Sequence, residues 1–320
     1  MLKEFQEAIE KEINALTFQE PGELYEPIQY IMQLGGKRLR PLLCLLSYNL
    51  FAQEWKKILK PALALEIFHN FTLMHDDIMD NAPIRRGKQT IHKKWNSNVG
   101  ILSGDVMLVK AYEHFTTVEG KYLLSVLNSF NKCATRVCEG QQMDMNFETQ
   151  PAVSEKNYLS MIEKKTAALL GFSMELGGIL GGQNSEVTEK LYNYGRNLGL
   201  AFQLKDDLLD VFGDEQFGKQ SGGDIISNKK TFLLIKVLQK ASGTDRKTLL
   251  YWLDQKEFDS EEKVKEVKAI YTRLKIREEA ESRINGYFDL ATENLRYFKA
   301  NKNAWELLFS FTGNLKSREK

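Results

Sequence analysis

Residues 61–80 read PALALEIFHNFTLMHDDIMD, an apolar stretch that ends in three aspartates. Apolar side chains recur through it at the spacing of a helix face, as Ile67, Phe71 and Met74 do. The pattern predicts a helix that is buried over most of its length. The polar residues at its carboxyl end are the starting point for interpreting the rest of the chain.

The three aspartates are Asp76, Asp77 and Asp80. At about 100° per residue, Asp76 and Asp80 lie within roughly 40° of each other around the helix, and His69 lies about 20° from Asp76. Like charges four residues apart destabilise an isolated helix by about 0.2–0.5 kcal/mol. Burying them among apolar side chains costs far more unless cations are present. One such cluster alone is compatible with a solvated helix end.

A second cluster of the same kind follows in AFQLKDDLLDVFGD, residues 201–214. Asp206 and Asp210 share a helix face there, and Gln203 precedes Asp206 by about one turn. Two copies, each after an apolar run, favour a functional role. Carboxylate oxygens without Cys or His ligands suit Mg²⁺, which takes few protein ligands and keeps water and substrate phosphate as the rest. The sequence therefore predicts two acidic walls that hold metal ions, which in turn hold a polyanion.

Cationic residues stand next to both clusters. The segment GGKRLRP, residues 35–41, places three cations on a glycine turn before a helix, and Arg85 and Arg86 follow the first cluster. Lys219 and Lys229 lie in the glycine-rich loop after the second cluster. Arg binds phosphate through paired hydrogen bonds and Lys binds it as a point charge. This repeated adjacency favours a diphosphate site over ordinary solvated loops.

The whole chain has the pattern of an all-α protein. It has 320 residues, of which 42% are hydrophobic, and no proline follows Pro151. We predict a single domain of packed helices over residues 1–320. The expected helices cover 2–16, 24–33, 41–53, 61–80, 97–116, 120–146, 154–178, 186–212, 230–241, 245–254, 261–283, 285–300 and 303–315.

Charge and cysteine content argue against several classes of protein. The 44 basic and 43 acidic residues give a net charge of +1, so we expect no nucleic-acid or membrane-surface partner. The uncharged stretch 41–53 is too short to span a bilayer and the amino terminus lacks a secretory apolar region, which favours a cytoplasmic protein. Cys44, Cys133 and Cys138 lack metal-site spacing, which indicates buried thiols.

On these residues the chain resembles trans-isoprenyl diphosphate synthases of the polyprenyl synthetase family, of the farnesyl and geranylgeranyl diphosphate synthase type, over about residues 30–240. Two aspartate motifs in this order, each with flanking cations, are highly specific. The matching segments are GGKRLRP (35–41), HNFTLMHDDIMD (69–80), RRG (85–87), SGD (103–105), GQQMD (140–144), KTAAL (165–169), FQLKDDLLD (202–210) and G-K-x-x-G-x-D (218–224). One departure is Leu233, where the family usually has proline.

The resemblance implies the isoprenoid synthase fold, in which one all-α domain surrounds a deep central cavity, and a homodimer. It also implies Mg²⁺ as the cofactor, with three ions in each active site once substrate is bound. The ions would bridge an allylic diphosphate to Asp76, Asp80 and Asp206, and Asp77 and Asp210 would support them.

The resemblance also assigns residues to the two substrates. The cations for the allylic diphosphate would be Arg85, Lys165, Lys219 and Lys229. Thr166 and Gln203 would lie near the carbon that becomes cationic. The residues for isopentenyl diphosphate would be Lys37, Arg40, His69 and Arg86.

The implied reaction is short-chain trans-prenyl transfer. The allylic C–O bond ionises, the alkene of isopentenyl diphosphate attacks the cation, and a proton is lost, with the released diphosphate as the expected acceptor. Water must be excluded, and the loop 213–223 and the tail 316–320 are candidate lids. The resemblance places the floor of the product cavity at Phe71 and Thr72, and a bulky Phe71 favours farnesyl or geranylgeranyl diphosphate as the product.

Several alternatives stay open on the sequence alone. A medium- or long-chain synthase for quinone side chains differs only in the depth of the product cavity. A terpene cyclase does not need a second diphosphate site, and a non-catalytic partner subunit usually degrades one aspartate motif. A His/Asp metallohydrolase would need further His ligands, and His92 and His114 lack the matching spacing.

Overall fold

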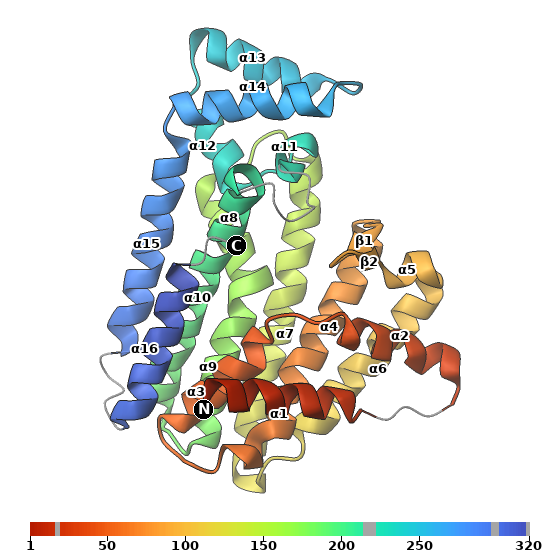
Figure 1. Ribbon diagram of the computed structural model, residues 1–320, viewed down its shortest axis with the longest axis vertical. Coiled ribbons are helices and arrows are strands. Elements are labelled where there is room, and N and C mark those ends of the chain that lie inside the picture. The colour runs from red at the N-terminus through yellow and green to blue at the C-terminus, as the bar shows by residue number, and fades with distance from the viewer. Residues whose placement is uncertain (17–19, 214–221, 296–300, 318–320) are drawn as a thin grey trace. The chain divides into compact units, whose positions relative to one another are not determined.

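The computed structural model describes residues 1–16, 20–213, 222–295 and 301–317, and almost all regular structure in these ranges is helical (Figure 1). The helices are α1 (Leu2–Asn14), α2 (Gly22–Gln33), α3 (Leu39–Asn49), α4 (Leu59–Met79), α5 (Ile91–Lys94), α6 (Ser97–Phe115), α7 (Gly120–Thr149), α8 (Glu155–Ile162), α9 (Ala168–Leu180), α10 (Ser185–Phe212), α11 (Gly223–Ile226), α12 (Phe232–Lys240), α13 (Gly243–Asp254), α14 (Ser260–Arg273), α15 (Ile276–Leu295) and α16 (Lys302–Lys316). The described ranges also contain a 3₁₀ turn, η1 (Trp55–Ile58), a π-helical turn, η2 (Glu163–Ala167), and an antiparallel hairpin of β1 (Ile84–Arg85) and β2 (Lys88–Gln89).

The all-α prediction is confirmed, and most expected helices begin and end within a few residues of the observed ones. The helix expected at 261–283 is wrong, because α14 ends at Arg273 and α15 begins at Ile276. Lys275 between them has φ +56°, a left-handed conformation that interrupts a right-handed helix. No glycine or proline marks this break, and the hairpin, α5, α11 and η1 were not expected either.

The described residues form two compact units. Unit 1 contains residues of 1–133, 172–192 and 298–308, and unit 2 contains residues of 134–171, 193–297 and 309–320. The single domain and its central cavity stay predictions.

Unit 1 is built around α4, which packs mainly against α6 and α3. Glycines on α6 allow a close crossing, because a Cβ at Gly104 would lie 2.1 Å from His75 Nε2 and a Cβ at Gly100 would lie 2.8 Å from Ile78 Cδ1. His75 Nε2 also contacts the carbonyl oxygen of Ile101 at 3.2 Å. The Ser-Gly-Asp segment 103–105 thus holds the carboxyl half of α4 against α6.

Aromatic rings fill the centre of unit 1. Phe130 packs edge-on against Phe68 with ring centroids 5.0 Å apart, and it packs against Phe115 at 4.6 Å. Phe172 contacts both Phe115 and Phe130. All four side chains are at most 1% exposed, and each buried Phe contributes about 1.5–3 kcal/mol of transfer free energy. This core anchors the helix that carries the first aspartate cluster.

Unit 2 brings backbones together at glycines. A Cβ at Gly195 of α10 would lie 2.3 Å from the carbonyl oxygen of Leu170, and one at Gly199 would lie 2.5 Å from Ala167 Cα. A Cβ at Gly140 of α7 would lie 2.2 Å from the backbone nitrogen of Lys165. These contacts require glycine, and they fix η2 and the start of α9 against their neighbours. Elsewhere in unit 2, α12 packs on α8 and α15, and α11 packs on α14.

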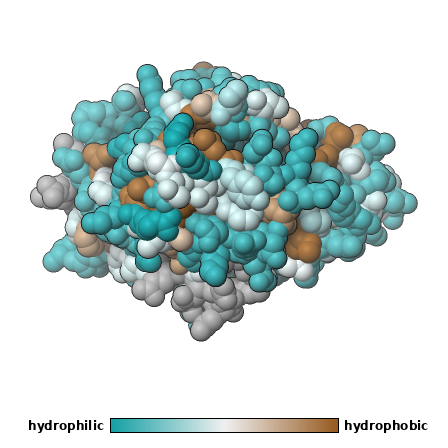
Figure 2. Space-filling view, turned by 90° about the horizontal axis from the view of Figure 1, so that it is seen from above, coloured by the Kyte–Doolittle hydropathy of each residue, from teal (hydrophilic) through white to brown (hydrophobic). Residues whose placement is uncertain are grey.

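The face in Figure 2 is mostly hydrophilic, with hydrophobic residues in small scattered groups. Scattered exposed apolar residues are normal on globular proteins. Within the described residues, no helix is both long and apolar enough to cross a membrane.

Candidate active site

The first aspartate cluster lies at the carboxyl end of α4, in unit 1. Asp76 is half-buried, Asp80 is exposed at the helix cap, and Asp77 between them is only 2% exposed. The Asp80 N–H donates to the carbonyl oxygen of Asp76 at 2.8 Å, which continues the helical turn through the cluster. The first and last aspartates are therefore the ones placed toward solvent.

The middle aspartate is paired with Arg85 of β1. Arg85 Nε donates to the two Asp77 carboxylate oxygens at 2.9 and 2.8 Å, and Nη2 donates to Oδ1 at 2.7 Å. Such forked, charge-assisted contacts are the strongest ordinary hydrogen bonds in proteins. The sequence placed Asp77 with the metal ions and Arg85 with the diphosphate, whereas the structure joins the two side chains to each other.

The glycine turn before α3 is adjacent to Arg86. Gly35 and Gly36 have φ +77° and +138°, and a Cβ at Gly36 would lie 3.0 Å from the Arg86 guanidinium. Arg86 Nη1 donates to the carbonyl oxygen of Gly35. Lys37 and Arg86 are exposed and Arg40 is half-buried. Three of the four residues predicted for isopentenyl diphosphate thus lie on or against one turn.

His69, the fourth predicted residue, faces the same cations. Burial lowers its pKa well below the ordinary value of 6.5, and the positive charges of nearby arginines lower it further. These arginines are, in order of effect, Arg40, Arg86, Arg85 and Arg38. A neutral imidazole among guanidinium groups offers hydrogen bonds to an anion without adding to the charge that repels them.

The second cluster lies on α10, in unit 2, and repeats the arrangement of the first. Asp206 and Asp210 are half-buried, whereas Asp207 between them is 4% exposed. The Tyr158 hydroxyl donates to Asp207 Oδ2, and Gln203 Nε2 donates to Oδ1 at 3.2 Å. Burial raises the pKa of Asp207 to about 6, and the Tyr158 hydrogen bond opposes this rise. As in the first cluster, the middle aspartate is buried and hydrogen-bonded to other side chains.

The predicted residues of η2 join this network. Thr166 Oγ1 donates to Gln203 Oε1 at 3.0 Å, which links η2 to the second cluster through a single side chain. Lys165 Nζ contacts Asp144 Oδ2 at 2.7 Å. π-helical turns are rare in proteins, and those that occur are often found at functional sites.

Lys229 lies on the loop after α11, half-exposed, with its Nζ 4.0 Å from Asp224 Oδ1. Asp224 belongs to α11, and its backbone N–H donates to Asp210 Oδ2 at 2.8 Å, so α11 is tied to the second cluster. Lys219, most of the candidate lid 213–223 and the last three residues of the candidate tail lie outside the described residues.

The two predicted floor residues lie one turn before the first cluster. The Phe71 ring is half-buried between Phe68 and His75, with centroid distances of 5.6 and 4.7 Å. The Thr72 hydroxyl donates to the His69 carbonyl oxygen of its own helix at 2.8 Å. Phe71 therefore presents the larger apolar surface of the two, and the role of both as a floor stays a prediction.

The carboxylates around Asp224 in unit 2 suit a divalent cation. Burial raises the pKa of Asp224 to about 7, Lys229 opposes the rise, and the carboxylates of Asp210, Asp207 and Asp144 add to it. Within the described residues, no three His, Cys, Asp or Glu side chains converge as a ready-made cage. A carboxylate-only donor set of this kind fits Mg²⁺, which needs one or two protein oxygens and keeps water and phosphate as its other ligands.

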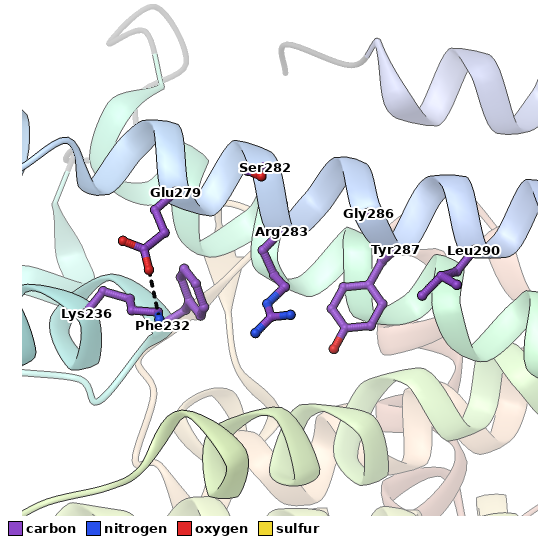
Figure 3. Close-up of a pocket in the computed structure, with 8 residues that line it drawn as sticks. All are labelled: Phe232, Lys236, Glu279, Ser282, Arg283, Gly286, Tyr287 and Leu290. Atoms are coloured by element: carbon purple, nitrogen blue, oxygen red, sulfur yellow. Dashed lines mark ion pairs between the residues drawn. The ribbon is translucent and has the colours of Figure 1, made fainter.

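One pocket in unit 2 contains none of the predicted residues. It has a volume of about 580 Å³ and lies between α12 and α15, with Tyr287 and Leu290 at one end and Phe232 beside Lys236 at the other (Figure 3). Its charged groups are already paired, because Lys236 Nζ lies 2.8 Å from Glu279 Oε1 and Arg283 pairs with Glu155 of α8. It therefore offers no unbalanced charge to a diphosphate.

Sequence reasoning missed several residues that hold the site together. Tyr158 carries no distinguishing pattern, since it lies in an ordinary helical segment. Asp144 ends the matching segment GQQMD (140–144), but no role was predicted for it. Glu66 did carry a signal, because it is the one charged residue in the apolar run 61–75. Arg38 was quoted in the glycine turn but received no role.

The chain is similar to several known proteins. A sequence model of the family described as Polyprenyl synthetase matches residues 21–271. The geranylgeranyl diphosphate synthase of Saccharolobus solfataricus is 40% identical over 291 residues, which cover 89% of this chain and 87% of that protein. That of Methanosarcina mazei is 41% identical over 228 residues, 70% of each chain. A crystal structure of a geranylgeranyl pyrophosphate synthase aligns with a TM-score of 0.95 at 41% identity, covering 100% of this chain and 99% of that one.

Proposed function

Since the chain belongs to the polyprenyl synthetase family, we propose that it is a short-chain trans-prenyltransferase that condenses isopentenyl diphosphate with allylic diphosphates and that its main product is geranylgeranyl diphosphate. The observation that carries the proposal is the common design of the two aspartate clusters. In each cluster the first and last aspartates are half-buried or exposed, and the buried middle aspartate is hydrogen-bonded to another side chain of the protein.

Mg²⁺, when bound, would stabilise the negative charge that develops on the leaving diphosphate. Asp76 and Asp80 on α4, and Asp206 and Asp210 on α10, are the residues that would hold it. Arg85 would act on the allylic diphosphate from its position beside Asp77. Lys165 and Lys229, which now contact carboxylates at 2.7 and 4.0 Å, would supply further positive charge.

The reaction breaks the allylic C–O bond and forms a C–C bond between the resulting cation and the terminal alkene carbon of isopentenyl diphosphate. Loss of one proton from the adduct then regenerates an allylic alkene, with the released diphosphate as the acceptor. Gln203 and Thr166, fixed to each other at 3.0 Å, would flank the cationic carbon with oxygen dipoles. Lys37, Arg40, His69 and Arg86 would hold isopentenyl diphosphate.

The product length is proposed from two observations. The relatives named above are geranylgeranyl diphosphate synthases. The Phe71 side chain is large and half-buried one turn before the first cluster, where a bulky group would stop chain growth.

A homodimer is proposed on the basis of exposed apolar residues in unit 1. Leu102 and Val109, seven residues apart on one face of α6, are 58% and 56% exposed, and Leu124 at the start of α7 is 72% exposed. Pairing of these faces between two copies would bury them. Light scattering would test this, and a monomer at micromolar concentration would contradict it. The cytoplasmic location stays a prediction.

The test of the activity is incubation with Mg²⁺, labelled isopentenyl diphosphate and each of the C5, C10 and C15 allylic primers, with EDTA as the control. We expect metal-dependent elongation that stops at geranylgeranyl diphosphate. Longer products would favour the medium- or long-chain synthase. Absence of incorporation by a folded dimer would favour the cyclase or the partner subunit and would refute the proposal.

A further inference from the structure

Glu66 is a buried carboxylate in the middle of α4, one turn before His69. Its side chain is 2% exposed, and its Oε1 accepts hydrogen bonds from Arg38 Nη1 at 2.9 Å and from Asn70 Nδ2 at 3.3 Å. Its Oε2 is buried and has no hydrogen-bond partner within the described residues. Burying a carboxylate costs several kcal/mol unless opposite charges surround it, so its surroundings must supply that charge.

Arg38 is the direct partner and has an unusual backbone. Its φ is +46°, in the left-handed region that costs a residue with a Cβ about 1–2 kcal/mol. Its guanidinium is held by three groups: Glu66, Glu10 Oε1 at 2.8 Å, and the Met32 carbonyl oxygen at 2.7 Å. These contacts stabilise the strained backbone of the turn that carries Lys37 and Arg40.

Glu66 also acts on the two neighbouring cations at longer range. Burial lowers the pKa of Arg40 to about 10, and Glu66 is the strongest charge opposing that effect. The same holds for Arg86, whose pKa is lowered by partial desolvation and by other arginines and raised most by Glu66. Glu10 has no comparable effect on either residue. Glu66 is thus the common counter-charge of three guanidinium groups.

We propose that Glu66 is a positioning residue for the diphosphate of isopentenyl diphosphate. Through Arg38 it holds the turn 35–40 in the conformation that presents Lys37 and Arg40 and against which the Arg86 guanidinium packs. Glu66 itself does not contact the substrate. This inference rests on the proposed function, which assigns the surrounding cations to isopentenyl diphosphate.

The test compares two variants that each remove one Arg38 ion pair. Glu66→Gln keeps the shape of the side chain and removes the charge shared with Arg40 and Arg86. Glu10→Gln is the matched control, because Glu10 pairs with Arg38 at 2.8 Å, against 2.9 Å for Glu66, but its side chain is 44% exposed. Calorimetry would measure the Kd of isopentenyl diphosphate without a primer, and kinetics would measure KM for both substrates and kcat.

We expect Glu66→Gln to raise the Kd and KM of isopentenyl diphosphate about tenfold, as loss of a charged hydrogen bond typically does. We expect Glu10→Gln to change them about twofold at most, as for a partly exposed ion pair. The KM of the allylic substrate should stay nearly constant in both variants. A more positive site would by itself bind an anion more tightly, so weaker binding identifies positioning as the dominant effect.

Unchanged or tighter binding in Glu66→Gln, an equal loss in Glu10→Gln, or a parallel rise in both KM values would each overturn the inference. If Glu66→Gln does not unfold cooperatively and is therefore not properly folded, Glu66→Asp is measured in its place. It retains the charge, so it should bind isopentenyl diphosphate nearly as tightly as the wild type, and a tenfold loss would overturn the inference. A wild type that binds isopentenyl diphosphate but forms no product refutes the proposed function, and the binding comparison still decides the role of Glu66. A wild type that does not bind it overturns both.

Discussion

The contact between Asp77 and Arg85 allows the two roles predicted for Asp77 to be separated. If Asp77 is a structural partner of Arg85, the pair should be coupled in stability, and Mg²⁺ affinity should depend little on Asp77. If Asp77 is a metal ligand, Mg²⁺ affinity should depend strongly on it, and its coupling in stability with Arg85 should be small. The variants Asp77→Asn, Arg85→Gln and the double variant form a complete thermodynamic cycle.

The magnitudes follow from burial. Arg85→Gln leaves a carboxylate that is 3% exposed without its partner. Breaking a fully buried pair costs about 3–5 kcal/mol, and because the Arg85 side chain is 28% exposed, water can reach the vacated space, so we expect about 2–4 kcal/mol. Asp77→Asn leaves a guanidinium that can turn to solvent and should cost about 1–2 kcal/mol.

The double variant contains no unpaired buried charge, so it should cost about 1–2 kcal/mol, less than the sum of the single changes. Urea unfolding at one protein concentration would measure all three free energies. A coupling energy near zero would refute the structural pairing.

The Mg²⁺ dependence of turnover provides the second readout. Asp77→Asn should move the Mg²⁺ concentration for half-maximal rate by about twofold at most, whereas Asp80→Asn should move it about tenfold, because it removes a direct ligand. Equal shifts in the two variants would identify Asp77 as a metal ligand and contradict its assignment as a structural partner of Arg85.

Three further predictions concern other parts of the chain. Phe71→Ala should lengthen the main product in the primer assay, because it removes the largest side chain at the proposed floor, and unchanged length would exclude Phe71. Tyr158→Phe should lower the free energy of unfolding by about 1–3 kcal/mol, since it leaves the buried Asp207 carboxylate without its hydroxyl donor; an unchanged urea midpoint would contradict this. The folded-state pKa of His69 lies below its unfolded value of 6.5, so as the pH falls through 6.5 the unfolded chain gains the proton first and stability decreases. His69→Gln should flatten this decrease, by up to about 1.4 kcal/mol per pH unit, in unfolding curves measured between pH 7 and pH 5, and a parallel slope would count against a neutral His69.

Much of the fold was predictable because helices are local. The apolar spacing in 61–80 reports on residues three or four positions apart, which is the range of helical contacts. The absence of proline after Pro151 removes the commonest helix breaker from the rest of the chain. The error at 261–283 arose because no local signal marks the break. Lys275, between α14 and α15, takes a left-handed conformation, and a lysine carries no intrinsic preference for it.

The candidate site was predictable in its residue types and less so in its pairings. The spacing of Asp76 and Asp80 follows from helix geometry alone. The contact of Asp77 with Arg85 depends on a hairpin that brings residue 85 back over the helix end, and two short strands leave almost no periodic signal. The link from Asp207 to Tyr158 crosses 49 residues, which no local pattern encodes.

The sequence by itself determined the helical class, the two acidic clusters and the cations beside them, because these depend on composition and short-range spacing. Tertiary structure decided which members of each cluster face solvent and which face the interior. Packing buries Asp77 and Asp207 at 2% and 4% exposure, and a buried carboxylate must then find a donor within its own unit. The same requirement turns Glu66, an isolated charge in the sequence, into the counter-charge of three arginines, since the low dielectric of the interior makes an unpaired charge far more costly there than in water.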